Sequence, residues 1–352
     1  MKKFLRFLNS TDNFEYFNAI LRRRVSLLLD YDDYVNILRG DMHSFEQFLL
    51  DSRYGESYRQ ELIRGRNSIL ARIEHAVANH VSEELKHSRK IAEGEVLTLL
   101  EVILARADLL NSRLALRAFF SGSTGGADPL WHSYGSLPLF FFNDIWNSSS
   151  SISNAIEKCH SNGHPLALSL ASALMDMQSG SELFHAERTL LLSVIDHLRK
   201  QLEVSGSKNS QRVEEYLGMN IDLWNLGMWV RSNYGVSGDH IIKRSYIPGG
   251  LCFDISDLER NKLLGLLVRG TVWNGAIDLL ENIEPRDIQR AMQRQFLKWQ
   301  RQLYRANPLG IEVSLGYVAR ELTEWENLNL LAVGMASGVE SEELIKRLIP
   351  LS

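Results

Sequence analysis

Cysteine, proline and long apolar runs are scarce in this sequence. Its two cysteines in 352 residues, Cys159 and Cys252, fit a reducing compartment. Seven prolines and few alternating apolar and polar stretches favour helices over strands. No segment approaches the ~20 consecutive apolar residues that a membrane-spanning helix needs. We therefore expect a helical protein that reaches a membrane only as a peripheral component.

Sequence motifs for nucleotide, metal or hydrolase chemistry are also missing. The polar stretch Ser205–Ser210 lacks the upstream glycine of a phosphate-binding loop, and Gly122–Gly126 lacks the lysine. Cys159, His160 and His164 match no strong zinc spacing, so we expect them in a surface turn. A net charge of −4 argues against a nucleic-acid partner. The sequence thus predicts no cofactor, no metal and no catalytic residue.

The sequence does contain a motif that occurs three times. In each copy an acid is followed three positions later by an asparagine, and then by an apolar stretch that ends at glycine. Each copy is followed by an apolar residue and a proline, at positions 137–138, 247–248 and 349–350. The acid and asparagine pairs are Asp108 and Asn111, Asp222 and Asn225, and Glu326 and Asn329. Self-similarity of this kind predicts a repeated structural unit.

The motif divides the chain into three helical repeats, residues 1–128, 129–248 and 249–352. Each repeat is expected to end in a long helix, a turn and a second long helix. In the first repeat, helical spacing places Asp108 and Asn111 on the apolar stripe of the second helix. A weaker pattern places one polar residue near the start of the first long helix in each repeat: Glu74, Glu187 and Gln289.

Two interpretations of these polar rows follow, because a buried acid and a buried amide need partners. In the interpretation that we favour, each acid and asparagine bonds across its own helix pair and fixes the helix register. In the other, the three repeats face a common axis, and Asp108, Asp222 and Glu326 bind a cation through oxygen. A metal-dependent enzyme would then be a further hypothesis. It predicts that Asp108→Asn abolishes an activity and leaves the melting temperature nearly unchanged.

A basic cluster stands out in an otherwise slightly acidic chain. Arg22, Arg23 and Arg24 follow one another and are the candidate contacts for a partner, either acidic lipid headgroups or an acidic protein surface. The alternative, which we favour slightly, is a solvated helix face with local ion pairs.

Several stretches together resemble one known family. They are Tyr16–Leu29, Tyr34–Leu38, Leu49–Tyr54, Ile73 and Glu74 with Asp108–Asn111, and the ending Glu326–Leu348. In their order and threefold recurrence they resemble the C-type component of archaeal-type and bacterial V-type ATPases, which corresponds to the d-type component of eukaryotic vacuolar ATPases. The resemblance covers about residues 14 to 350.

The resemblance implies an all-α, funnel-shaped protein of three pseudo-equivalent repeats. In the family this protein is a non-catalytic part of the rotor on the cytoplasmic face of the membrane. It sits on the membrane rotor ring, receives the foot of the central-stalk heterodimer (D/F type), and passes torque between them during ATP-linked proton or sodium transport. It is not expected to form homo-oligomers for this role.

A second class of function fits the same helical pattern. A helical scaffold could bind a protein partner in a groove without any link to an ATPase. The identity of the bound partner separates this hypothesis from the rotor component.

Overall fold

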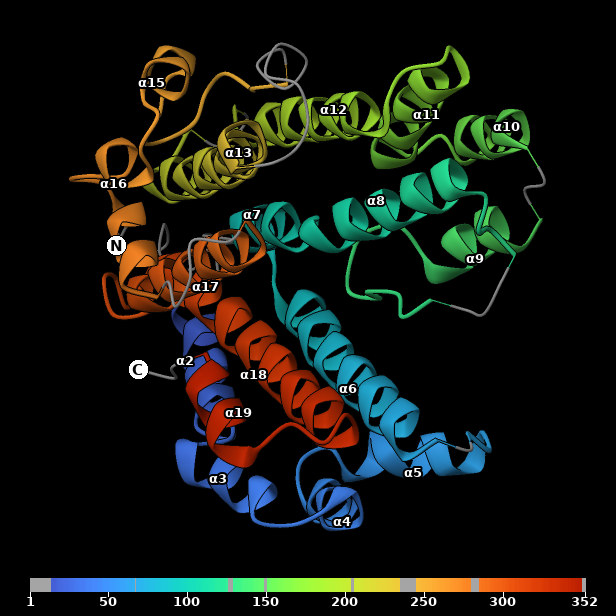
Figure 1. Ribbon diagram of the computed structural model, residues 1–352, viewed down its shortest axis with the longest axis vertical. Coiled ribbons are helices and arrows are strands. Elements are labelled where there is room, and N and C mark those ends of the chain that lie inside the picture. Colours follow the sequence, from blue (N-terminus) through green and yellow to red (C-terminus); the bar gives the residue numbers. More distant parts are fainter. Residues whose placement is uncertain are drawn as a thin grey trace, which may run out of the picture. The chain divides into compact units, whose positions relative to one another are not determined.

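The computed structural model describes residues 14–66, 68–125, 129–148, 151–203, 206–234, 245–279 and 285–349 (Figure 1). Every regular element in these ranges is a helix, and no strand occurs among them. The all-α fold predicted from the sequence is therefore confirmed. The division into three repeats and their arrangement as a funnel stay predictions.

The chain forms two compact units. Unit 1 comprises residues 1–97, 132–134 and 300–352, and unit 2 comprises residues 98–131 and 135–299. Unit 1 therefore combines the beginning of the chain with its end. The last residues of α17 (Pro285–Leu303) belong to unit 1, and the rest of that helix belongs to unit 2.

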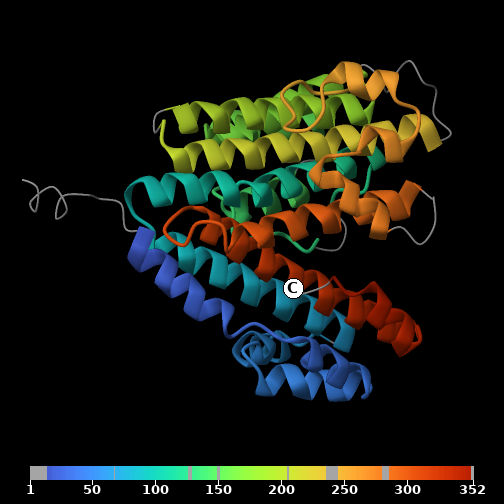
Figure 2. The same ribbon diagram turned by 90° about the vertical axis from the view of Figure 1, so that its left-hand side faces the viewer.

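Unit 1 is built around two long helices. Helices α6 (Ile69–Ile91) and α18 (Glu312–Ala336) pack side by side, and α2 (Phe14–Val25) packs against α18 (Figures 1 and 2). Shorter helices complete the unit: α3 (Tyr31–Leu38), α4 (Met42–Asp51), α5 (Gly55–Ile63) and α19 (Ser341–Arg347).

Helix α6 forms where the apolar spacing predicts a long helix. The side chain of Ser68 caps its first turn by accepting a hydrogen bond from the amide of Ala71. Ile73, Val77 and Leu85 recur at helical spacing and are completely buried. This buried face brings α6 against α18.

Helix α18 differs from α6 because it is buried on almost every side. All residues from Glu312 to Ala319 and from Glu321 to Trp325 are buried. A helix without a wet face lies in the core of its unit. Gly316 permits this packing, because a Cβ atom there would lie 2.5 Å from the Cβ of Tyr304. The polar side chains of α18 must consequently find partners inside the protein.

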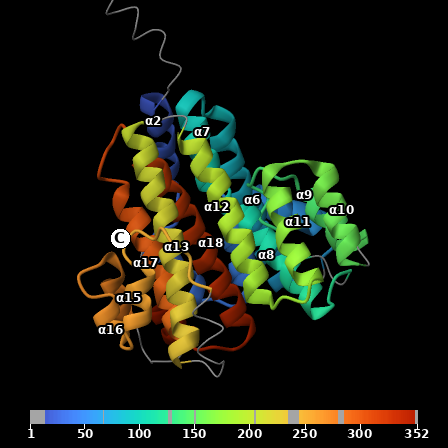
Figure 3. The same cartoon turned by 90° about the horizontal axis from the view of Figure 1, so that it is seen from above.

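Unit 2 is a second set of packed helices. Helix α12 (Leu183–Glu203) lies beside both α11 (Pro165–Gln178) and α13 (Lys208–Tyr234), as Figure 3 shows. Helix α8 (Arg106–Ser121) also packs against α12. The other helices in or entering this unit are α7 (Gly94–Leu104), α9 (Leu139–Ser148), α10 (Ile152–Asn162), α15 (Ile255–Arg260), α16 (Leu264–Leu267) and the 3₁₀ helix η1 (Val272–Leu279).

None of the helices in the described ranges has the length and apolar character needed to cross a membrane.

Candidate functional site

Two buried asparagines each hold the backbone of a loop that returns to their helix. In α13, Asn225 donates a hydrogen bond from Nδ2 to the carbonyl of Ile247 and accepts one from the amide of Ile247, both at 2.8 Å. In α18, Asn327 makes the same pair of bonds with Ile349, at 3.1 and 2.8 Å. In both cases the isoleucine lies 22 residues after the asparagine. The two units therefore contain the same local device, an asparagine clamp.

The clamp in α18 corrects the register predicted for the third repeat. The sequence assigned this role to Glu326 and Asn329, but Glu326 is exposed and Asn329 is only half-buried. The matching acid and asparagine are Glu324 and Asn327, both fully buried. The two candidate pairs have identical spacing and lie two residues apart, which is about 200° around a helix. An apolar stripe could not choose between them because α18 is buried on almost every side.

The acids of the first two motifs are bound by backbone amides. Asp108, in α8, accepts hydrogen bonds from the amides of Ser136 and Leu137 at 2.7 and 3.0 Å. Asp222, in α13, accepts one from the amide of Cys252 at 2.8 Å. Burial raises the pKa of Asp222 to about 6. Each carboxylate therefore fastens a loop of its own unit.

A glycine makes room for each of these carboxylates. A Cβ atom at Gly135 would lie 2.3 Å from a carboxylate oxygen of Asp108, and one at Gly250 would lie 2.1 Å from a carboxylate oxygen of Asp222. Any side chain at these two positions would displace a buried acid. Asn111, the remaining member of the first motif, is also buried in α8.

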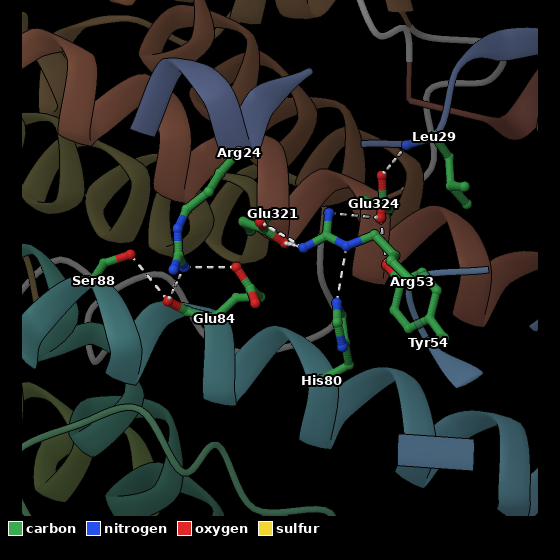
Figure 4. A network of polar contacts seen from close by, with 9 residues as sticks. All are labelled: Arg24, Leu29, Arg53, Tyr54, His80, Glu84, Ser88, Glu321 and Glu324. Carbon is green, nitrogen blue, oxygen red and sulfur yellow. Dashed lines mark hydrogen bonds and ion pairs between the residues drawn. The ribbon is translucent and has the colours of Figure 1, made fainter. Parts of the chain in front are cut away.

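A dense polar cluster surrounds Arg53, in the turn between α4 and α5 (Figure 4). Its Nη2 donates to both carboxylate oxygens of Glu321, at 2.9 and 3.2 Å, and its Nη1 donates to Glu324 at 3.3 Å. Its Nε donates to Nε2 of His80 at 2.8 Å, and the hydroxyl of Tyr54 donates to Glu324. We call these five residues the Arg53 cluster.

The charged groups in the Arg53 cluster do not balance, because one guanidinium group faces two carboxyl groups. The side chains of Glu321 and Glu324 are 0% and 1% exposed. Burial, together with the charge of Glu321, raises the pKa of Glu324 to about 7, and burial also raises the pKa of Glu321. Burial and the charge of Arg53 lower the pKa of His80 to about 3. His80 is therefore neutral, and its Nε2 accepts a hydrogen bond from Nε of Arg53.

The Arg53 cluster joins segments that are far apart in the chain. The amide of Leu29, after α2, donates to Glu324 at 2.6 Å, so the connection from α2 to α3 is tied to α18. Beside the cluster, Arg24 donates to the carboxylate of Glu84 at 2.6 Å and to its backbone carbonyl at 3.3 Å. These bonds connect α2 with α6, and Figure 4 shows both sets together.

The raised pKa of Glu324 predicts a specific pH dependence of stability. In the unfolded chain this carboxyl titrates near 4.5, so between pH 4.5 and 7 the folded chain holds a proton that the unfolded chain has released. The contribution of Glu324 to the free energy of unfolding therefore falls as the pH rises. We measure the free energy of unfolding by urea denaturation at pH 5 and at pH 8. Between these two pH values the decrease in this free energy should be about 2–3 kcal/mol smaller for Glu324→Gln than for the wild type. Equal losses would contradict the assignment.

The three arginines of the predicted basic cluster lie in different environments. Arg24 is 15% exposed and paired with Glu84, as described above. The guanidinium of Arg22 lies 5.2 Å from the ring centre of Tyr304, and Arg23 is exposed. Contact of these arginines with a partner stays a prediction, and Arg23 is the residue best placed to test it.

Of the three residues in the weaker pattern, one polar residue in each repeat, only Glu187 is buried, and it pairs with two arginines. Glu187, in α12, is 2% exposed and binds Arg117 at 2.6 Å and Arg113 at 3.2 Å, both from α8. Burial alone would raise the pKa of Glu187, but the two arginines outweigh it and hold the pKa below its usual value. Glu74 and Gln289 are only half-buried, and burial raises the pKa of Glu74.

The contacts of the predicted acids favour the structural interpretation over a cation site. Within the described ranges no three His, Cys, Asp or Glu side chains converge in a geometry suited to a metal ion. Asp108 and Asp222 accept hydrogen bonds from backbone amides. Glu324 accepts hydrogen bonds from Arg53, Tyr54 and the amide of Leu29.

Comparison with known proteins places the chain in a family. Residues 17–347 match the ATP synthase (C/AC39) subunit family. The C-type component of the A-type ATP synthase of Haloquadratum walsbyi is 24% identical over 348 residues, which cover 95% of this chain and 98% of that protein. The corresponding proteins of Halobacterium salinarum and Methanococcoides burtonii are 22% and 20% identical, and the alignments cover 96% and 99% of this chain and 98% and 97% of those proteins.

The chain therefore belongs to the ATP synthase (C/AC39) subunit family, as the sequence resemblance indicated. The match extends through both units, from α2 to α19. The Arg53 cluster and the Asn225 and Asn327 side chains of both asparagine clamps lie within it.

Proposed function

We propose that the chain is the non-catalytic component that couples the central stalk of a rotary A/V-type ATPase to its membrane rotor ring. In this role it transmits torque between the stalk, a heterodimer of D/F type, and the ring, while ATP turnover elsewhere is linked to proton or sodium transport. It would work on the cytoplasmic face of the membrane, held there through the ring. The observation that carries the proposal is the family match along residues 17–347.

The interior of unit 1 supports a role that demands stiffness. A part that passes torque must keep its helices in fixed register under load. The Arg53 cluster cross-links three segments to α18: the connection after α2, the turn after α4 and helix α6. Fully bonded polar networks in a core favour one arrangement of helices over others. We infer that the cluster resists sliding of α18 against its neighbours.

We also propose that the chain is a funnel of three repeats, residues 1–128, 129–248 and 249–352. The support is local: Asn225 and Asn327 close their loops with the same pair of bonds over the same distance in sequence. Asp108 and Asp222 both accept hydrogen bonds from backbone amides of a loop, and a glycine in that loop leaves room for the carboxylate. A repeated device of this kind suits pseudo-equivalent repeats.

Co-elution with the stalk tests the proposed function. The purified chain is mixed with the central-stalk heterodimer from the same source and separated by size-exclusion chromatography. A complex that survives moderate salt is expected. No complex at tens of micromolar, from a chain with a helical circular dichroism spectrum, would contradict the proposal and favour a helical scaffold for another partner.

The exposed arginine of the basic cluster gives a residue-level test of docking. Arg23→Glu should weaken binding to the stalk or to the ring by about tenfold at low salt, because reversing a charge at the rim of an interface slows association and weakens it. Arg39→Glu, at the exposed end of α3, is the matched control and should leave both affinities unchanged. If Arg23→Glu binds both partners like the wild type, the basic cluster is not part of either interface.

A further inference from the structure

Helix α2 has apolar side chains on two sides, and its own unit covers only one of them. Phe17 and Leu21 are completely buried where α2 packs against the rest of unit 1. On the other side, Tyr16 is 66% exposed, and Leu27, just after the helix, is 61% exposed. Large apolar side chains that gather at a surface mark a site of interaction.

The exposed side chains of α2 lie along one surface groove of about 480 Å³. Four of its lining residues recur at steps of four, three and four, which is the spacing of one helix face. They are Tyr16, Ile20, Arg23 and Leu27, and we call them the α2 face. The amide of Leu27 donates to the carbonyl of Arg24 at 3.0 Å, so the helical turn extends to the end of this face.

The charge of the α2 face is positive and is not neutralised by the described part of the chain. At the side of the groove, Arg24 and Glu84 pair with each other at 2.6 Å. Arg23 is exposed, and its guanidinium group makes no ion pair or hydrogen bond with the described residues. Its neighbour Arg22 is also exposed and lies over the ring of Tyr304 without an acid partner among these residues. Two guanidinium groups are therefore open to an anion.

Positive charge is concentrated in this part of the sequence. The first 29 residues contain six basic and two acidic side chains, a net charge of +4, whereas the whole chain carries −4. The stretch Lys2–Leu8, which lies outside the described residues, consists of three basic and four apolar residues. Basic side chains mixed with aromatic and aliphatic ones are typical of contacts with anionic lipid surfaces.

The order of residues on the α2 face suits the boundary of a bilayer. Tyr16 and Ile20 precede Arg23, and Leu27 follows it, so apolar side chains flank the charge. At such a boundary an arginine binds lipid phosphates, and tyrosine and leucine side chains enter the headgroup region. Phosphates of acidic lipids also complement the positive charge of residues 1–29.

We propose that the α2 face binds an anionic lipid surface, with Arg22 and Arg23 on lipid phosphates and with Tyr16 and Leu27 in the headgroup region. The basic residues before α2 add to the attraction. This contact goes beyond the proposed coupling role and does not depend on it, because it needs neither the stalk nor the ring.

Co-sedimentation of the full chain with lipid vesicles tests the proposal. The vesicles contain phosphatidylcholine alone or an equal mixture of phosphatidylcholine and phosphatidylglycerol, and no other protein is present. Binding to the mixed vesicles should be at least about tenfold tighter than to phosphatidylcholine alone. It should weaken as the salt concentration rises from about 0.05 M to about 0.5 M. Equal binding to both kinds of vesicle, or binding to neither, would overturn the proposal.

Substitutions on the α2 face locate the contact. Arg23→Gln and Leu27→Ser should each weaken binding to the mixed vesicles severalfold, because the first removes a phosphate contact and the second removes buried apolar area. The matched controls Arg39→Gln and Ile63→Ser change an exposed arginine and an exposed apolar residue of unit 1 outside the groove, and both should bind like the wild type. If a control weakens binding as much as its counterpart, the α2 face is not the site.

A further variant separates the α2 face from the basic residues before it. Replacing Lys2, Lys3 and Arg6 by glutamine should weaken binding to the mixed vesicles, and adding Arg23→Gln should weaken it severalfold more. If Arg23→Gln has no effect in either background, the lipid contact belongs to the residues before α2, and the proposal is wrong.

The stalk and the ring are the competing occupants of the α2 face. If Arg23→Glu weakens a complex with either of them and binds the mixed vesicles like the wild type, the face serves a protein, and the lipid proposal is wrong. If Arg23→Glu loses vesicle binding and keeps both complexes, the lipid contact is supported, and the coupling role is unaffected.

Discussion

Replacing Arg53 by methionine is expected to lower the free energy of unfolding of unit 1 by about 3–5 kcal/mol, because it leaves buried carboxylates without their cation. Glu321 and Glu324 are almost fully buried, and Arg53 is the guanidinium that binds both. Methionine keeps much of the side-chain volume, so the effect reports charge and hydrogen bonding more than packing. Urea denaturation, with hydrogen exchange of the α18 amides to assign the transition to unit 1, measures the loss.

A surface arginine nearby provides the control for this experiment. Arg59, in α5, pairs with Glu56 at 3.7 Å, and both side chains are largely exposed. Arg59→Met should therefore cost less than about 1 kcal/mol. Adding Glu321→Gln to Arg53→Met should recover part of the loss, because one unpaired buried charge is removed. A loss below about 1 kcal/mol for Arg53→Met would show that the cluster does not hold the unit together.

The asparagine clamps carry the second large expected effect. Asn225→Ala and Asn327→Ala should each lower the free energy of unfolding by about 2–4 kcal/mol, because each leaves a buried amide and a buried carbonyl of one isoleucine without partners. Asn233→Ala is the matched control in α13. Asn233 makes a single bond to the carbonyl of Trp229, so its removal should cost well under about 2 kcal/mol.

The same series checks the corrected register of the third motif. Asn329→Ala should be milder than Asn327→Ala, because Asn329 is only half-buried and is not the partner of Ile349. A larger loss for Asn329→Ala would restore the register predicted from the sequence. If both clamp variants match the Asn233→Ala control, the returning loops are held by other contacts.

Much of the fold is visible in the sequence because helical periodicity is a local signal. The first long helix predicted for the first repeat, with Glu74 near its start, corresponds to α6. Asp108 and Asn111 were predicted to be buried because they fall on an apolar stripe, and both are buried, as are Asp222 and Asn225 of the second motif. The family resemblance was also accessible, because it depends on the order of several short motifs.

The Arg53 cluster could not be predicted, because its members meet only in the folded chain. Arg53 lies 268 residues before Glu321 and 271 before Glu324. Nothing in the turn that carries it marks this arginine as the partner of two buried carboxylates. Glu321 and Glu324 stand in a polar stretch that also contains Arg320, so the local sequence does not mark these two acids as buried either.

Sequence patterns also fail to show which face of an almost fully buried helix a given residue occupies. In α8 the apolar stripe separates a buried side from a wetter one and identifies Asp108. In α18 the stripe extends around the helix, so Glu324 and Glu326 look equivalent in sequence. Burial of Glu324 follows from its partners Arg53, Tyr54 and the amide of Leu29, which come from other segments of the chain.

The most direct test of the proposed coupling role is ATP-driven ion transport in membrane vesicles prepared with and without this chain. Without the chain, the catalytic head should still hydrolyse ATP when released, and the vesicles should build no proton or sodium gradient from ATP. Adding back the purified chain together with the stalk should restore the gradient. Transport of unchanged rate in vesicles that lack the chain would contradict the account.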